Sequence, residues 1–214
     1  MFNIKNLDTL RTYSSYPDDS LGLFLLQMIM LFKPKNIVET GFYNGYGSIF
    51  MAKGIQLLKN SGKIISIDIN EKAKKQYDIY VKGNKLDDII KLIIKDSAKA
   101  LVDVKAIFNN GIDLLFIDGD HSYEGCKKDW LTYNECLNKG SVILIHDFTL
   151  PGVNKCIQEI KQHVSFHDEY DFMHFPIYHN MVVMRKKDYV LKKQEGQVAF
   201  NLDIMSDIIN FRTK

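Results

Sequence analysis

The chain has 214 residues, of which 46% are hydrophobic and 25% charged, and no Pro/Gly-rich linker divides it, so we expect one domain with one sizeable core. The net charge of +2 comes from Lys residues spread along the chain, and the sequence therefore predicts no nucleic-acid groove. The Cys residues are odd in number and lack CxxC spacing, which speaks against a disulfide framework and a structural zinc site and favours a reducing, cytoplasmic location.

The sequence predicts no attachment to a membrane. The first residues lack a basic region followed by an apolar core. The apolar stretch at residues 21–32 is shorter than the ~20 residues that a membrane span needs. Its apolar residues recur instead at helical spacing, with Asp18 or Asp19 as a possible N-cap and Pro34 after its end. We therefore expect an amphipathic leading helix.

Strands and helices alternate after this leading helix. The predicted strands are residues 36–39, 63–67, 89–94, 112–117 and 141–145, and the predicted helices are residues 45–58, 71–83, 98–108, 123–137 and 153–163. Parallel strands joined by helical crossovers need burial on each side. The alternation therefore predicts an α/β fold with a mostly parallel, doubly wound sheet and helices on both faces.

The last part of the chain departs from this alternation. Residues 172–175 and 180–185 are predicted to be two strands joined by a short connection that contains Pro176. Residues 189–214 carry apolar positions that have no place in the sheet. We expect residues 1–188 to form the domain and residues 189–214 to be an extension that serves as a lid or as a contact in a homo-oligomer.

A glycine-rich turn follows the first predicted strand. Glu39 ends that strand, and Gly41, Gly45 and Gly47 allow a tight turn with close backbone approach to a ligand before the next helix. The spacing GxxxGxG differs from the dinucleotide pattern GxGxxG. A plain strand-to-helix turn is the alternative interpretation.

Two further acidic residues follow the second and third strands. Asp68 stands 27 positions after Gly41, where a carboxylate can accept hydrogen bonds from both ribose hydroxyls of a nucleoside; its alternative role is a helix N-cap. Asp96 can meet an adenine amino group, with Ser97 near the ring edge, or it can cap the helix that follows. The three features occur in order after three successive strands, which favours a nucleoside site.

A second group of polar residues follows the fourth and fifth strands. Asp118, Asp120 and His121 come directly after residues 112–117, and His146 and Asp147 come directly after residues 141–145. We expect these strands to be neighbours, so that carboxylates and imidazoles share one crevice. Such a cluster suits an oxygen-preferring divalent cation, with Mg²⁺ expected. His146 has an alternative role as a side chain bonded beneath the site.

These motifs resemble those of class I S-adenosylmethionine-dependent methyltransferases, in particular the small-molecule O-methyltransferases with an IDGDHSYEG-like signature, over residues 20–186. The resemblance implies a seven-stranded, Rossmann-like sheet with one antiparallel strand near the end. It also implies cofactor contacts: Glu39, Gly41 and Gly45 at the methionine part, Asp68 at the ribose, Asp96 and Ser97 at the adenine, and Asp118 facing the methyl group.

The resemblance extends to metal-dependent catechol-type O-methyltransferases, with one departure. It implies Asp118 and Asp147 as metal ligands, but Phe148 stands where those enzymes have Asn. Either His146 or water completes the metal shell, or the chain has no catalytic metal. His121 falls where those enzymes place their general base, and Asp120 is the rival. His121 can also be a helix-start residue bonded to the local backbone.

The resulting hypothesis is an enzyme that moves the methyl group of S-adenosylmethionine to a hydroxyl oxygen of a small molecule, a sugar or a phenol. Two alternatives remain. An NAD-binding oxidoreductase would use Asp68 for the ribose of NAD, although GxGxxG is absent. A non-catalytic nucleoside-binding domain is the other, prompted by Phe148. The remaining residues are assigned to packing or to the surface: Asp129 packs its helix on the sheet, and His163, His167, His174 and His179 lack metal-site spacing.

Overall fold

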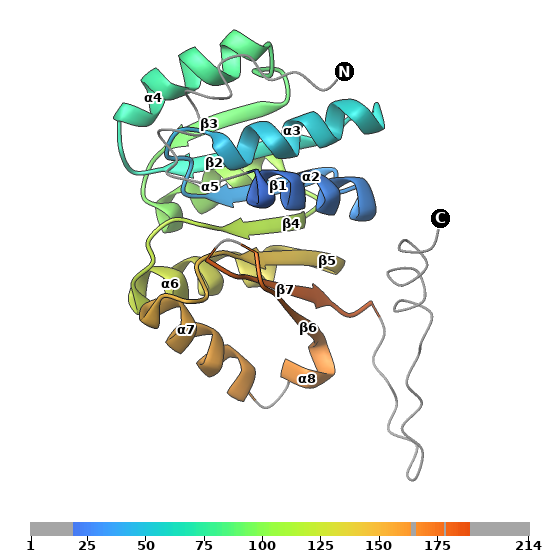
Figure 1. Ribbon diagram of the computed structural model, residues 1–214, viewed down its shortest axis with the longest axis vertical. Coiled ribbons are helices and arrows are strands. Elements are labelled where there is room, and N and C mark those ends of the chain that lie inside the picture. The colour runs from blue at the N-terminus through green and yellow to red at the C-terminus, as the bar shows by residue number, and fades with distance from the viewer. Residues whose placement is uncertain (1–18, 164–165, 178, 189–214) are drawn as a thin grey trace.

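The computed structural model describes residues 19–163, 166–177 and 179–188. These residues form a seven-stranded sheet with the order β3-β2-β1-β4-β5-β7-β6 (Figure 1). The strands are β1 (Asn36–Thr40), β2 (Lys63–Asp68), β3 (Ile90–Ile94), β4 (Ile112–Ile117), β5 (Leu137–Ile145), β6 (Tyr170–Phe175) and β7 (Met181–Lys186).

The pairing of the strands confirms the predicted fold class. β1 lies between β2 and β4 and pairs with both in parallel, and the chain then moves outward on each side of β1. β7 pairs antiparallel with β5 and β6, so it is the antiparallel strand expected near the end. In such a sheet the direction of winding reverses between β1 and β4. Ligands bind at the carboxyl ends of the strands at this point.

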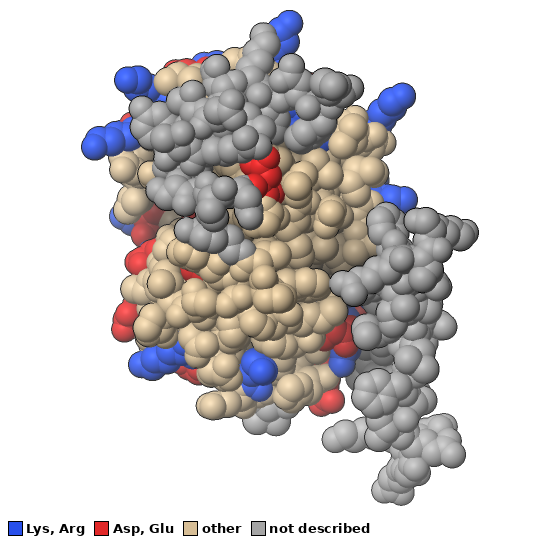
Figure 2. Space-filling model, in the orientation of Figure 1, with Lys and Arg blue, Asp and Glu red and all other residues tan. Residues whose placement is uncertain are grey.

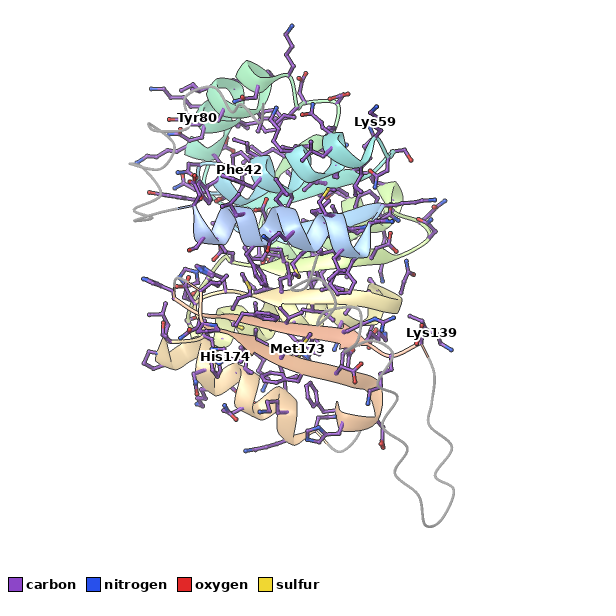
Figure 3. The ribbon with its side chains drawn as sticks, turned by 45° about the vertical axis from the view of Figure 1, so that its right-hand side comes forward. Phe42, Lys59, Tyr80, Lys139, Met173 and His174 are labelled. Atoms are coloured by element: carbon purple, nitrogen blue, oxygen red, sulfur yellow. The ribbon has the colours of Figure 1, made fainter. Side chains whose placement is uncertain are left out.

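Helices cover both faces of the sheet (Figure 1). One face carries α2 (Ser20–Phe32), α3 (Tyr46–Leu58) and α4 (Lys72–Gln76); the other carries α5 (Ser97–Ile107), α6 (Tyr123–Tyr133), α7 (Pro151–Gln162) and the short α8 (Phe166–Glu169). Figure 3 shows side chains filling the space on both sides of the strands, with Phe42 and Tyr80 on the side of α3 and α4.

The core has two halves because successive side chains of a strand point to opposite faces. On β4, Leu114 and Phe116 pack beneath α2 and α3, whereas Leu115 and Ile117 pack beneath α5 and α6. All four side chains are at most 3% exposed. Full burial of such a side chain contributes about 1.5–3 kcal/mol, so β4 anchors both halves of the core and holds the residues that follow it in place.

Three predicted elements differ in detail from the structure. The helix expected at residues 71–83 is α4 followed by a π-helical turn (Tyr77–Val81) and a 3₁₀ turn (Lys82–Asn84). The helix expected at residues 123–137 ends at Tyr133, and β5 begins at Leu137 rather than at Ser141. The register of β4 and β5 shifts between Ile112 and Leu114, and this irregularity lets the polar residues after Leu137 extend the strand.

The sequence also led to expectations about membrane spans, the charged surface and the C-terminal residues. No helix among residues 19–163, 166–177 and 179–188 is long and apolar enough to cross a membrane. On the face seen in Figure 2, Lys and Arg side chains are scattered around the rim and form no continuous patch. The absence of a nucleic-acid groove stays a prediction. The extension at residues 189–214, with its proposed role as a lid or oligomer contact, lies outside the described residues.

Candidate active site

A cavity of about 710 Å³ opens at the carboxyl ends of the parallel strands. Its volume is in the range of ligand pockets. The lining includes almost every residue singled out from the sequence: Glu39, Gly41, Asp68, Asp96, Ser97, Asp118, Asp120, His121, His146 and Asp147. Gly45 is not among the lining residues. The structure therefore brings the predicted nucleoside residues and the predicted reacting residues into one cavity.

The glycine turn depends on two glycines with positive φ. Gly41 has φ 90°, and a Cβ atom there would stand 2.1 Å from the carbonyl oxygen of Asp118, in the loop after β4. Gly45 has φ 85°, precedes α3 and faces the ring of Phe42, which a Cβ would approach to 2.6 Å. Only glycine fits either position. The turn is thus held against the backbone that carries Asp118.

Glu39 lies beneath the start of α3 and is 1% exposed. Its Oε2 atom accepts hydrogen bonds from the hydroxyls of Ser48 and Ser66, the latter at 2.6 Å. Burial raises the pKa of Glu39 to about 8; the bonds from the two serines oppose this shift, and the charges of Asp118 and Asp68 add to it. The carboxyl group is therefore neutral at pH 7 in the ligand-free chain.

Asp68 fixes the other side of the glycine turn. Its Oδ2 accepts a hydrogen bond of 2.7 Å from the backbone N–H of Tyr43, and its Oδ1 accepts one of 2.8 Å from the N–H of Asn70. A carboxylate oxygen has more than one acceptor site. The same group can therefore hold the turn and still accept hydrogen bonds from a ligand in the cavity.

Asp96, the third acidic residue predicted from the sequence, already forms hydrogen bonds within the protein. Asp96 caps α5 by accepting hydrogen bonds from the N–H groups of Ala98 and Lys99, and its other oxygen lies 3.0 Å from Lys128 Nζ. The bond from Lys128 is the largest cause that lowers the pKa of Asp96. The capping role foreseen as an alternative is thus real. Asp96 caps α5 and at the same time lines the cavity.

Asp129 of α6 lines the same part of the cavity, which the sequence did not reveal. Its side chain is 3% exposed, and its Oδ1 accepts a hydrogen bond of 2.5 Å from the hydroxyl of Ser97. Burial raises the pKa of Asp129. This carboxyl group holds Ser97 at the cavity wall.

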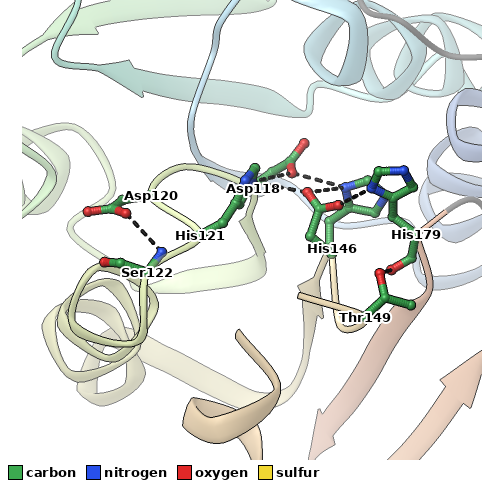
Figure 4. A network of polar contacts seen from close by, with 8 residues as sticks. Asp118, Asp120, His121, Ser122, His146, Thr149 and His179 are labelled. Carbon is green, nitrogen blue, oxygen red and sulfur yellow. Dashed lines mark hydrogen bonds and ion pairs between the residues drawn. The ribbon is translucent and has the colours of Figure 1, made fainter. Parts of the chain in front are cut away.

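The reacting residues form a ring of contacts at the ends of β4 and β5 (Figure 4). His146 Nδ1 lies 3.1 Å from Asp118 Oδ1 and 3.1 Å from Asp147 Oδ2. His121 Nε2 lies 3.5 Å and 3.1 Å from the same two oxygens. The predicted neighbourhood of the fourth and fifth strands is confirmed, and two carboxylates and two imidazoles meet there.

The carboxylates and imidazoles of this ring stabilise each other's charged forms. Burial alone would lower the pKa of His146, but Asp118 and Asp147 outweigh it and raise that pKa to about 10. Burial would raise the pKa of Asp147, but His146, His121 and His179 hold it at about 2. A hydrogen bond to Asp118 is the largest cause that raises the pKa of His121. The His146 imidazolium therefore balances part of the negative charge of the two carboxylates.

Asp120 is turned away from this ring (Figure 4). Its Oδ1 accepts a hydrogen bond of 2.9 Å from the N–H of Ser122 at the start of α6, and this bond is the largest cause that lowers its pKa. A Cβ atom on Gly125 would stand 2.3 Å from its carboxyl carbon, so the side chain is also packed in place. Asp120 acts here as part of the helix start.

His179 belongs to the site although the sequence assigned it to the surface or core. Its Nδ1 lies 2.7 Å from Asp147 Oδ1, and its ring is nearly parallel to that of His146, with centroids 6.3 Å apart. β7 runs antiparallel to β5, so the residues before β7 arrive beside the end of β5. The predicted closing pair of strands was the one signal for this placement.

Asp118, His121 and Asp147 form a group that could hold a divalent cation, and His146 Nδ1 contacts both of its carboxylates. Neighbouring donor atoms around a cation with bonds of about 2.0–2.2 Å are about 3 Å apart, and the contacts in the ring measure 3.1–3.5 Å. Asp118, His121 and Asp147 each offer a ligand atom within 4.8 Å of the others. Phe148 packs against His174 with ring centroids 5.0 Å apart and contributes no donor.

Comparison with known proteins indicates the family of this chain. Residues 38–148 match a family described as methyltransferase domain. An uncharacterised protein, R132, from Acanthamoeba polyphaga mimivirus is 27% identical over 81% of this chain and 75% of its own length. Catechol O-methyltransferase from Mus musculus is 24% identical, over 75% of this chain and 62% of its own length.

Solved structures agree on the fold. An O-methyltransferase from Bacillus cereus in complex with SAH superposes with a TM-score of 0.69 and 16% identity, over 85% of this chain and 90% of that one. The family match covers more than half of the described residues and contains the whole glycine turn and both reacting loops. The chain therefore belongs to this methyltransferase family and is a class I S-adenosylmethionine-dependent O-methyltransferase.

Proposed function

We propose that this enzyme transfers the methyl group of S-adenosylmethionine to a hydroxyl oxygen of a small sugar or phenol, assisted by a divalent cation. One observation carries the proposal: the cavity that contains Asp68 and Ser97 also contains the ring of Asp118, His121, His146 and Asp147. A cofactor-binding region and a group of proton-accepting and cation-binding side chains thus share one space.

The protein has three tasks in this reaction. The methyl carbon is already activated by the positive sulfur of the cofactor, so the chain must align the acceptor, take up its proton and exclude water. The contacts favour His121 over Asp120 as the general base. His121 faces the cavity with a side chain that is 41% exposed, whereas Asp120 is bonded to the backbone of Ser122.

The cation would be held by Asp118, Asp147 and His146, with His121 beside it. A bound divalent cation lowers the pKa of a hydroxyl group and fixes its oxygen. In this proposal Asp118 and Asp147 supply the negative charge that such a cation needs, and both lie at strand ends that are firmly packed. Removal of divalent cations with EDTA should then abolish transfer and leave binding of the cofactor largely intact.

Two observations support a small-molecule acceptor: the small size of the described domain and the similarity to a catechol enzyme. The described residues form one sheet with its helices, and no separate acceptor domain is present among them. A catechol enzyme is among the relatives, which supports a phenol. A sugar hydroxyl fits the same chemistry. A cytoplasmic location remains part of this proposal.

Calorimetric titration with S-adenosylhomocysteine, with Mg²⁺ or with EDTA, tests the cofactor part. We expect binding in the micromolar range, about −8 kcal/mol, and no detectable binding for Asp68→Ala, because Asp68 holds the glycine turn. A screen of phenols and sugars with labelled cofactor tests the rest. Binding of NAD in place of S-adenosylhomocysteine would favour the oxidoreductase, and binding without transfer to any acceptor would favour the non-catalytic domain.

A further inference from the structure

The donor atoms of the reacting ring are of two kinds. The sequence suggested Mg²⁺ held by Asp118 and Asp147, with His146 or water completing the metal shell. The structure interleaves imidazole nitrogens with the carboxylate oxygens, because His146 Nδ1 lies 3.1 Å from an oxygen of Asp118 and 3.1 Å from an oxygen of Asp147. His146 is 2% exposed and directly follows the buried second half of β5, residues 141–145. A cation between the two carboxylates would therefore meet a nitrogen that cannot move away.

The two histidines of the ring differ in exposure. The side chain of His121 is 41% exposed and that of His146 is 2% exposed. Both contact the same oxygens of Asp118 and Asp147. An exposed imidazole suits exchange of a proton with an acceptor, whereas a buried one suits permanent coordination. We therefore assign the nitrogen ligand to His146 and leave His121 as the base.

Nitrogen and oxygen donors select different cations. Mg²⁺ takes oxygen ligands in octahedral geometry and keeps several waters. Imidazole suits Fe²⁺, Co²⁺, Ni²⁺ and Zn²⁺, and affinity for a site with nitrogen donors rises along the first transition series. Replacing the amide oxygen of the catechol-type enzymes with Phe148, and placing His146 before Asp147, shifts the donor set in this direction.

His179 contacts the outer side of the ring. It bonds Asp147 through Oδ1 at 2.7 Å, while Oδ2 of the same carboxylate faces His121 and His146 at 3.1 Å. Partners of this kind hold a ligand in orientation without touching the cation. His179 should therefore affect how strongly any cation is bound and should not affect which cation is preferred.

We infer that this site takes a first-row transition cation such as Co²⁺, Fe²⁺ or Zn²⁺ in preference to Mg²⁺, with His146 as the ligand that sets the preference and His179 as a positioning residue for Asp147. The inference rests on the cation-assisted function proposed above. It replaces Mg²⁺ with a transition cation and leaves the proposed methyl transfer unchanged.

The experiment measures cation binding directly, without turnover. Chelator-treated full-length chain is titrated calorimetrically with MgCl₂ and with CoCl₂, and Mn²⁺-loaded chain is examined by electron spin-echo envelope modulation for directly bound ¹⁴N. We expect Co²⁺ to bind about 100-fold or more tightly than Mg²⁺ and the nitrogen modulation to be present. Equal affinity for the two cations, or bound Mn²⁺ without nitrogen modulation, would overturn the inference.

Two variants distinguish the preference for one cation over another from the overall affinity for cations. His146→Asp should lower the Co²⁺/Mg²⁺ affinity ratio at least about tenfold and remove the nitrogen modulation, because a carboxylate replaces the imidazole. His179→Ala should weaken both cations by a similar factor, about 10–100-fold, and leave their ratio unchanged. His167→Ala, at an exposed histidine outside the cavity, is the matched control and should change neither value.

The outcomes distinguish this inference from the proposed function. An unchanged ratio in His146→Asp contradicts the inference and leaves Mg²⁺-assisted transfer possible. If His146→Asp does not fold, His121→Ala decides, because nitrogen modulation that persists without His121 comes from His146 and modulation that disappears contradicts the inference. A chain that binds no cation contradicts both the inference and the cation part of the proposed function, whereas titration with S-adenosylhomocysteine continues to test the methyltransferase itself.

Discussion

Replacing Glu39 with Gln tests whether its carboxyl group is protonated in the folded chain. Gln keeps the size of the side chain and an oxygen that can accept the hydrogen bonds of Ser48 and Ser66. It removes only the ability to ionise. The difference in stability between parent and variant at each pH therefore isolates the titration of this one group.

The magnitude follows from the two pKa values. Glu39 has a pKa of about 8 when folded, against 4.5 as the ordinary value. Between these values the folded chain holds a proton that the unfolded chain has released, so the free energy of unfolding falls as pH rises. The loss is about 1.4 kcal/mol per pH unit, or about 4 kcal/mol from pH 5 to pH 8. Above pH 8 the difference should level off.

Urea unfolding of the ligand-free parent and Glu39→Gln at pH 5, 6, 7 and 8 measures this difference. We expect the variant to gain on the parent at each step, with the same dependence of unfolding free energy on urea in both chains. Ser66→Ala is a matched control, because it removes one hydrogen bond and leaves the carboxyl group. A constant difference across this range would show that Glu39 does not titrate as argued.

Three further predictions concern the cavity and the core. Asp68→Ala should abolish detectable binding of S-adenosylhomocysteine, whereas Asp118→Ala should bind it and fail to transfer; calorimetry and a transfer assay check this, and equal behaviour of both variants refutes the division of roles. Gly41→Ala should lower the unfolding free energy by at least about 2 kcal/mol, since a Cβ would stand 2.1 Å from a backbone oxygen; urea unfolding with parent-like stability would contradict it. Tyr133→Phe should cost about 1 kcal/mol through loss of its bond to the carbonyl of Ser97, measured the same way; no loss would mean that this bond contributes nothing.

The sheet was predictable because its strands are short apolar runs with clear ends. Residues 112–117 are apolar at all positions but one, and the strand they form is buried on both faces, as a central parallel strand must be. The start of β5 was not predictable in the same way. Asn138, Lys139 and Gly140 give no apolar signal, and they lie in the irregular stretch between the pairs Ile112–Leu137 and Leu114–Val142.

The site was predictable where its residues follow strands directly. Asp68, Asp118 and Asp147 come at or just after the ends of parallel strands, which meet at one edge of the sheet. His179 and Asp129 were missed for a physical reason. His179 reaches Asp147 from 32 positions along the chain, through an antiparallel return, and Asp129 reaches the cavity from the second turn of a helix. Spacing in the sequence carries no trace of either contact.

The start of α7 has a consequence for altering this enzyme. A Cβ on Gly152 would stand 2.5 Å from the carbonyl oxygen of His121 and 2.7 Å from the nitrogen of Tyr123, so two main chains touch with no side chain between them. The loop after β4 and the loop after β5 therefore cannot shift independently of each other. Attempts to broaden the range of acceptors should exchange both loops together with the first turn of α7, because a graft of either one alone would collide with the other.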